Sequence, residues 1–178
     1  VAQPTASTVM TIGDAARSLR GVVARVEEVA PPLARQASGL FADLYAADGG
    51  AWRRRILVAA GTMSRETAES SSGAGLPAGR FSELLEKWDQ FRSGMLTWLE
   101  AYDVVVCPVT SGPAPLHGEG VASAFSYTQL FSLTGWPCVV VRGGREGNLP
   151  VGVQVAARPY REDVALRVAR HLESELSR

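Results

Sequence analysis

The 178-residue sequence predicts an α/β fold in which a mixed sheet is covered by helices. Three observations support this class. Apolar residues recur at steps of three and four over several long segments, which is the spacing of an amphipathic helix. Short runs rich in valine lie between those segments and have the composition of strands. The length and the hydrophobic fraction of 46% suit a single domain with an ordinary core.

The first third of the chain predicts three helices and one strand. Apolar residues at helical spacing favour helices over residues 4–20, 33–47 and 52–60. Gly21 is expected to end the first helix. After it, Val22 to Val29 is expected to be a strand because of its β-branched residues, and Pro31 ends that strand.

A loop and a long helix are predicted for the middle of the chain. Glu69 to Gly79 contains a serine- and glycine-rich run of low complexity and is expected to be a mobile loop. From Phe81 to Tyr102, large apolar residues recur at helical spacing, which predicts a helix of about six turns. Its aromatic stripe is more typical of a buried helix face than of a ligand site.

A buried strand, a helix and a second strand are expected next. Val104 to Pro108 is apolar without alternation, which is typical of a strand covered on both faces. A helical segment then ends at Gly135. The run from Cys138 to Val141 has the composition of a strand.

The last part of the chain predicts a hairpin and a helix. The glycine-rich run Gly143 to Gly147 is expected to be a hairpin turn, because it joins two strands and opens no helix. In the strand that follows, Val151 to Val155, valines alternate with small or polar residues, so this strand is expected to be less enclosed. Residues 162–176 have the spacing of an amphipathic helix.

Charge and hydropathy exclude several classes of partner. The 18 basic and 18 acidic residues give a formal net charge of zero, which offers no electrostatic case for nucleic acid or an anionic membrane. No apolar run approaches the length of a membrane span, and no signal peptide is apparent, so a cytoplasmic location is expected. The chain begins at Val1 rather than at a methionine, which suggests a piece of a longer protein.

Few residues of the sequence are candidates for chemistry. There is no nucleophile elbow, no Walker loop, no zinc-protease motif and no spaced set of metal ligands, so neither a metal nor a cofactor is expected. His117 is expected in a polar loop and His171 on the surface of the last helix. Cys107 and Cys138 lie in apolar runs, which predicts buried, reduced thiols that are not bonded to each other.

The order of four short motifs in the second half of the chain is specific. They are a Tyr-Asp-apolar-Pro strand at 102–108, a helix-to-proline segment at 126–137, a Leu-Pro-x-Gly-x-Gln strand at 149–154 and the Arg-Pro turn at 158–159. This set resembles the C-terminal third of the amidase-signature hydrolases. The match covers roughly residues 86–176, and residues 4–32 resemble the family's mid-region. Ser132 stands where that family usually has Asn.

The resemblance implies a reaction but no catalytic residue in this chain. The family cleaves linear C–N amide bonds with a Ser–Ser–Lys triad in its N-terminal part. Ser70-Ser71-Ser72 lacks the preceding glycines of that motif, and the single lysine, Lys87, follows the serines instead of preceding them. The chain is therefore expected to be the C-terminal part of such a domain over residues 1–178 and to be inactive alone, with an N-terminal amidase segment as its partner.

The same resemblance suggests where substrate would bind. The loop after Pro108 and the helix before Gly135 are expected to wall the cleft for a small-molecule amide. The residues expected to bind substrate are Thr110, Phe125, Tyr127, Phe131 and Trp136.

Two other functions stay open. One is a catalytically inactive stand-alone domain that binds a small molecule or a protein. The other is a fragment of an amidotransferase A-type subunit, which uses the same chemistry on charged tRNA. The identity of the amide and the oligomeric state, a homo-oligomer included, also stay open.

Overall fold

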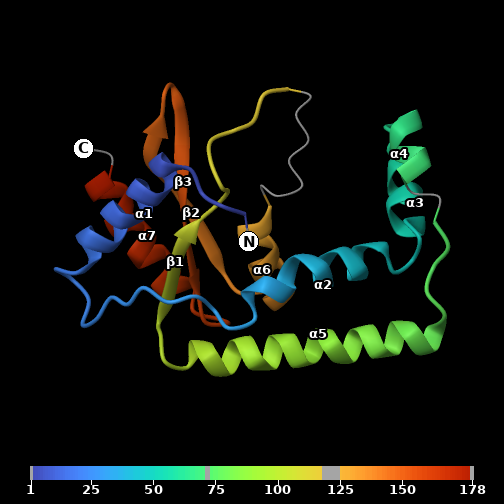
Figure 1. Ribbon diagram of the computed structural model, residues 1–178, viewed down its shortest axis with the longest axis horizontal. Helices are drawn as coiled ribbons and strands as arrows, with labels where there is room; N and C mark the ends of the chain where they lie inside the picture. Colours follow the sequence, from blue (N-terminus) through green and yellow to red (C-terminus); the bar gives the residue numbers. More distant parts are fainter. Residues whose placement is uncertain (1, 71–72, 118–124, 177–178) are drawn as a thin grey trace.

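The computed structural model describes residues 2–70, 73–117 and 125–176. This part of the chain forms seven helices and a three-stranded sheet (Figure 1). The helices cover both faces of the sheet, so the α/β class predicted from the sequence is confirmed. None of the described helices is long and apolar enough to cross a membrane.

The sheet is built from three strands in the order β1-β3-β2. Strand β1 covers Val104–Pro108, β2 covers Cys138–Glu146 and β3 covers Leu149–Ala157. Both pairings are antiparallel, and Val155 of β3 lies opposite Val106 on one side and Val139 on the other. Within these three strands the pairing is therefore antiparallel rather than mixed.

Two helices cover one face of the sheet. Helix α1 (Ala6–Leu19) and helix α7 (Glu162–Leu176) lie side by side against it (Figure 1). The core on this side joins both helices to alternate residues of the central strand. Its fully or almost fully buried residues are Ala15, Leu19, Val141, Val153, Val155, Ala169 and Leu172. Both helices were predicted from apolar spacing, and their bounds agree with the prediction.

Three other helices cover part of the opposite face. Helix α6 (Ser126–Thr134) packs between helix α2 (Ala34–Ala46) and the 22-residue helix α5 (Ala78–Leu99). This second core contains Ala37, Phe91, Met95, Leu99, Leu130, Phe131, Leu133, Trp136 and Ala156. The aromatic stripe of α5 thus reaches the core, as its spacing predicted.

Helices α3 (Ala51–Ala59) and α4 (Arg65–Ser70) stand away from the sheet, at the far end of α2 (Figure 1). None of the residues of α3 is buried. The loop expected from Glu69 to Gly79 is shorter than predicted, because Glu69 lies in α4 and Ala78 begins α5. Ser71 and Ser72 lie outside the described residues.

The strand predicted over Val22 to Val29 is wrong. This segment is irregular and largely exposed, and Val22 is 61% exposed. It passes outside the sheet without pairing to a described strand. Val26 packs against the core, but the segment has no neighbouring strand among those described, and a strand needs that partner.

Strand β1 was predicted to be more enclosed than β3, and the structure shows the reverse. Strand β3 is the central one, and Val153, Val155 and Ala156 are 0% exposed. Every residue of β1 is only half-buried, because β1 has no described neighbour on its outer side. Position in the sheet therefore decides burial here, and it overrides the alternation of residue types in the sequence.

The glycine-rich run before β3 belongs mainly to a strand. Strand β2 continues through Gly143 and Gly144, with a bulge next to Arg142, and the turn is made at Gly147 with φ +58°. A side chain at Gly144 would come within 2.3 Å of the Thr11 hydroxyl oxygen. These two glycines therefore let α1 lie directly on the strand.

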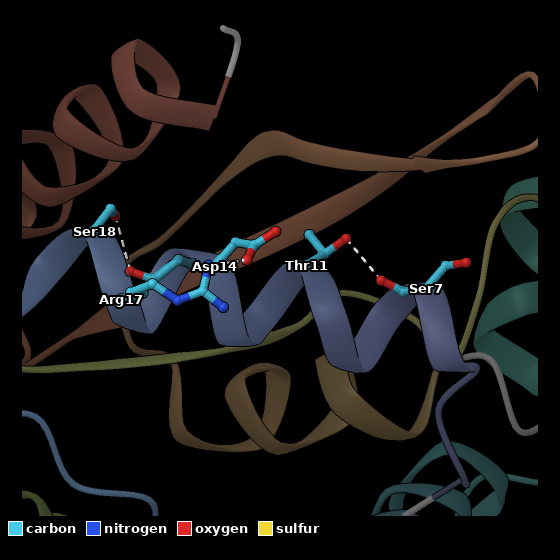
Figure 2. Close-up of polar contacts among 6 residues, drawn as sticks. Ser7, Thr11, Asp14, Arg17 and Ser18 are labelled. Atoms are coloured by element: carbon cyan, nitrogen blue, oxygen red, sulfur yellow. Dashed lines mark hydrogen bonds and ion pairs between the residues drawn. The ribbon is translucent and has the colours of Figure 1, made fainter.

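The buried Thr11 side chain is satisfied within its own helix. Its hydroxyl donates a 2.8 Å hydrogen bond to the carbonyl of Ser7 (Figure 2). One turn later on the exposed side, Arg17 forms an ion pair with Asp14. Thr11 can therefore pack against Gly143 and Gly144 without an unpaired polar atom.

Candidate functional site

The candidate site begins where β1 ends. After Pro108 the chain forms a half-buried loop over residues 109–113. Thr110 lies in this loop, and its hydroxyl donates a hydrogen bond to the carbonyl of Gly112. The hydroxyl thus closes a tight turn, and Thr110 keeps part of its surface accessible to a ligand.

Helix α6 forms the neighbouring part of the site. Its C-terminus is closed by Gly135, whose φ of +69° is readily adopted by glycine, as the sequence predicted. Two side-chain hydrogen bonds hold the helix from either side. Ser38 of α2 donates to Gln129, and Trp88 of α5 donates to the carbonyl of Leu133. Helix α6 is therefore fixed to the core through both neighbouring helices.

The five residues expected to bind substrate fall into different environments. Phe125, just before α6, is 55% exposed. Phe131 and Trp136 are 5% and 6% exposed and contact each other in the core, with their ring centroids 6.2 Å apart. The structure thus brings Phe131 and Trp136 together in the core, whereas Phe125 lies on the surface.

Tyr127 is held by the other end of the described chain. Its hydroxyl donates a 2.8 Å hydrogen bond to the carbonyl of Ala2. The side chain of the preceding residue, Ser126, accepts a 2.9 Å hydrogen bond from the backbone N–H of Ala2. Burial raises the pKa of Tyr127, so its hydroxyl stays protonated and able to donate at neutral pH. No pattern in the sequence indicates this contact.

Ser132, which stands in place of the family's usual Asn, is exposed. Its hydroxyl donates to the carbonyl of Thr128 in the preceding turn of α6. The short side chain is therefore bonded within its own helix.

The two cysteines do not form a disulfide, as predicted. The prediction that both cysteines are buried is wrong for Cys138, which is exposed. Cys107 is half-buried. Desolvation nevertheless raises the pKa of Cys107 to about 12 and that of Cys138 to about 11. The side-chain amide of Gln154 donates toward the sulfur of Cys107 at 3.6 Å. Neither thiol is therefore a nucleophilic thiolate at neutral pH.

The histidines do not complete a catalytic pair. His117 is exposed in the loop after β1. The Nε2 atom of His171 lies 3.2 Å from the carbonyl oxygen of Ser18, so this side chain joins α7 to α1. Among the described residues, no group of three His, Cys, Asp or Glu side chains could hold a metal ion.

The described surface contains open hollows. One open hollow is lined by residues 30–32, 34 and 35. Another lies between α2 and α5, next to Asp43 and Lys87. Neither hollow is lined by Thr110, Phe125 or Tyr127.

Comparison with known sequences identifies relatives of this chain. The family model described as Amidase matches residues 3–166. Fatty acid amide hydrolase 1 of Caenorhabditis elegans is 33% identical over a match that covers 40% of this chain and 18% of the relative. The A-type subunit of the glutamyl-tRNA(Gln) amidotransferase of Fusobacterium nucleatum is 31% identical over a match that covers 45% of this chain and 18% of the relative.

Solved structures agree over almost the whole chain. A 6-aminohexanoate cyclic dimer hydrolase superposes with a TM-score of 0.80 at 19% identity and covers 97% of this chain. A fatty acid amide hydrolase superposes with a TM-score of 0.81 at 18% identity and covers 100% of it. The chain spans only 42% and 38% of these two proteins. Since the family model covers most of the sequence and the fold agrees throughout, the chain belongs to the amidase family.

Proposed function

We propose that this chain is the C-terminal segment of an amidase that hydrolyses a carboxylic amide through a serine acyl-enzyme. The supporting observation is the match of the amidase family over residues 3–166 together with the small share of each related protein that the chain spans. In this proposal, a Ser–Ser–Lys triad lies in an N-terminal region outside this chain. The serine attacks the amide carbonyl, the amine leaves, and water then releases the acid.

The described residues would contribute one wall of the substrate cleft. Thr110 and Phe125 have accessible surface and would contact the substrate. Phe131 and Trp136 would support this wall from behind, because both are buried against α2 and α5. An exposed aromatic ring at the start of a helix whose other end lies in an aromatic core suits an apolar acyl or aryl group.

The proposed partner segment would cover the part of the sheet that these helices leave open. On β2, Cys138, Val140 and Arg142 are exposed, and Val140 retains 54% of its accessibility. On β1, the outer edge has no described partner strand. An exposed strand face with apolar residues and an unpaired strand edge are the features that a further part of a sheet would bury. Two free thiols agree with a reducing compartment, and the cytoplasm is the proposed location.

An activity assay with matched proteins tests the proposal. The complete protein should release product from a panel of aryl, aliphatic and fatty amides, and a serine-directed inhibitor should abolish the release. The 178-residue chain alone should release none. Turnover by the chain alone, abolished by the same inhibitor, would overturn the proposal that the catalytic triad lies outside this chain. Binding of amides by the chain without hydrolysis by the complete protein would favour the inactive binding domain.

A second candidate is an amidotransferase A-type subunit. It is favoured by the relatives of that name, which include the Fusobacterium nucleatum protein. The same assay distinguishes it when glutamine is the amide donor. Product formation that depends on glutamyl-tRNA would support the amidotransferase, whereas hydrolysis of simple amides without RNA would support the amidase.

A further inference from the structure

The first described residues, Ala2–Thr5, link two parts of the candidate wall. This segment runs from beside α6 to the start of α1 (Figure 1). At one end it contacts the first turn of α6, and at the other end it contacts the loop after β1. Those two parts of the wall are joined in sequence only through residues 114–124, so a direct link between them is structurally significant.

At α6, two neighbouring side chains hold both polar backbone groups of a single residue. The N–H of Ala2 donates to the Ser126 hydroxyl at 2.9 Å, and the carbonyl of Ala2 accepts from the Tyr127 hydroxyl at 2.8 Å. Ser126 is only 6% exposed. A buried hydroxyl that receives such a bond loses its partner if the segment leaves, and this loss is costly. The segment is therefore held in one position relative to α6.

At the other end, Thr5 holds the loop. Its backbone N–H donates to the carbonyl of Ser111 at 2.7 Å. A side chain at Gly112 would come within 3.0 Å of the Thr5 methyl group, so the loop backbone lies directly on Thr5. Thr5 is itself fixed, because its hydroxyl accepts from the N–H of Thr8 and donates to Glu146.

We propose that Ala2–Thr5 is a strap that sets the position of the loop after β1 relative to α6, and that Ser126 and Tyr127 are positioning residues that act through this strap. This inference rests on the proposed function, in which that loop and α6 wall the cleft. It gives Tyr127 a different role from direct contact with substrate. The hydroxyl of Tyr127 is already bonded to the carbonyl of Ala2. Loosening the strap should move Thr110 and thereby weaken substrate binding.

The first test measures the strap itself. Tyr127→Phe and Ser126→Ala each remove one hydrogen bond to Ala2. Tyr160→Phe and Ser174→Ala are matched controls, because Tyr160 is 91% exposed and Ser174 lies on the exposed side of α7. Hydrogen exchange of the Thr5 amide should accelerate about five- to tenfold in either strap variant and stay unchanged in the controls. Unchanged exchange at Thr5 in both strap variants would refute the strap.

The second test separates positioning from loss of stability. In the complete protein, Tyr127→Phe should raise KM for an amide substrate with kcat unchanged. A role limited to stability would lower the amount of active enzyme and leave KM unchanged, and this result would refute the positioning role. If the complete protein hydrolyses no amide while Thr5 exchange still accelerates, the proposed function fails and the strap stands.

Discussion

The hydroxyl of Thr5 donates a 2.6 Å hydrogen bond to the carboxylate of Glu146, which lies 141 residues later in the chain. Thr5 is also the N-cap of α1, because its side chain accepts from the N–H of Thr8. One hydroxyl therefore caps a helix and ties it to the end of β2. The negative charge of Glu146 also lies near the positive end of the α1 dipole, where it is favourable.

Thr5→Val should destabilise the fold because it removes the hydrogen bonds of the Thr5 hydroxyl with Thr8 and Glu146 while keeping the shape of the side chain. Loss of a helix cap and of a bond to a carboxylate should cost about 1–3 kcal/mol of unfolding free energy. Urea denaturation followed by circular dichroism measures this change. Thr97→Val on the exposed side of α5 is the control and should shift the midpoint little. Equal midpoints for the two variants would contradict this role of Thr5.

Gly144→Ala should destabilise the contact between α1 and β2. The added methyl group would lie 2.3 Å from the hydroxyl oxygen of Thr11, and overpacking of this kind costs about 1–3 kcal/mol. Gly13→Ala on the open side of α1 has no atom within 4 Å and is expected to stabilise slightly. Thr11→Ala should recover part of the loss in the double variant. Additive losses in the double variant would show that the two residues do not interact.

Arg158 should be replaceable by lysine only at a cost. Its Nε and one terminal nitrogen donate 2.9 Å hydrogen bonds to the carbonyls of Tyr102 and Glu100, beyond the end of α5. The planar guanidinium reaches both carbonyls at once, whereas an ammonium group has no such fork. Arg158→Lys should lower the unfolding free energy by about 1 kcal/mol. Arg167→Lys on the exposed side of α7 is the matched control, and an equal effect of both changes would contradict the prediction.

Much of the fold follows from local sequence, because apolar spacing marks helices well. The bounds expected for α1 and α7 lie close to those observed, and Gly135 closes α6 as expected. What local sequence does not contain is the neighbour of each strand. Val22 has the composition of a strand residue but no partner strand, whereas Val153 is fully buried because β3 has a strand on either side.

The candidate site was harder to predict for the same reason. The resemblance predicts a loop and a helix as walls of the site, but residue type alone does not separate exposed Phe125 from buried Phe131. The contact of Tyr127 with Ala2 joins residues 125 positions apart and leaves no periodic pattern. Such contacts depend on the packed fold, and only the structure reveals them.

Thiol labelling should be slow at neutral pH and should rise at alkaline pH. Across β3, Cys107 lies opposite Gln154 and Cys138 opposite Ala156, so the backbones of the two cysteines are about 11–12 Å apart, too far for a disulfide. Their pKa values of about 12 and about 11 leave little thiolate at pH 8. Iodoacetamide labelling should therefore accelerate steeply above pH 9, with Cys138 first. Rapid labelling of native protein at pH 7 would contradict the raised pKa values.

The same raised pKa values predict lower stability at high pH. In the unfolded chain a thiol ionises near its ordinary pKa, whereas in the folded chain Cys107 keeps its proton up to about pH 12. Above about pH 9 the unfolded state therefore binds fewer protons than the folded state, and unfolding becomes easier as pH rises. Cys107→Ala should reduce this loss between pH 9 and pH 11. An unchanged pH dependence in Cys107→Ala would contradict the assignment.

The chain alone should self-associate through the open part of its sheet. Val140 is 54% exposed on the sheet face opposite α1 and α7, and the outer edge of β1 has no described partner strand. Val140 lies on β2, which is the other edge strand of the described sheet. Val140→Lys should therefore shift the 178-residue chain toward monomer in analytical ultracentrifugation, since a charge on an edge strand opposes pairing with a second chain. Val22→Lys is the control, because Val22 is 61% exposed on an irregular segment away from the sheet. A clean monomer with a cooperative melt for the unchanged chain would favour a stand-alone domain over a segment that packs against a catalytic partner.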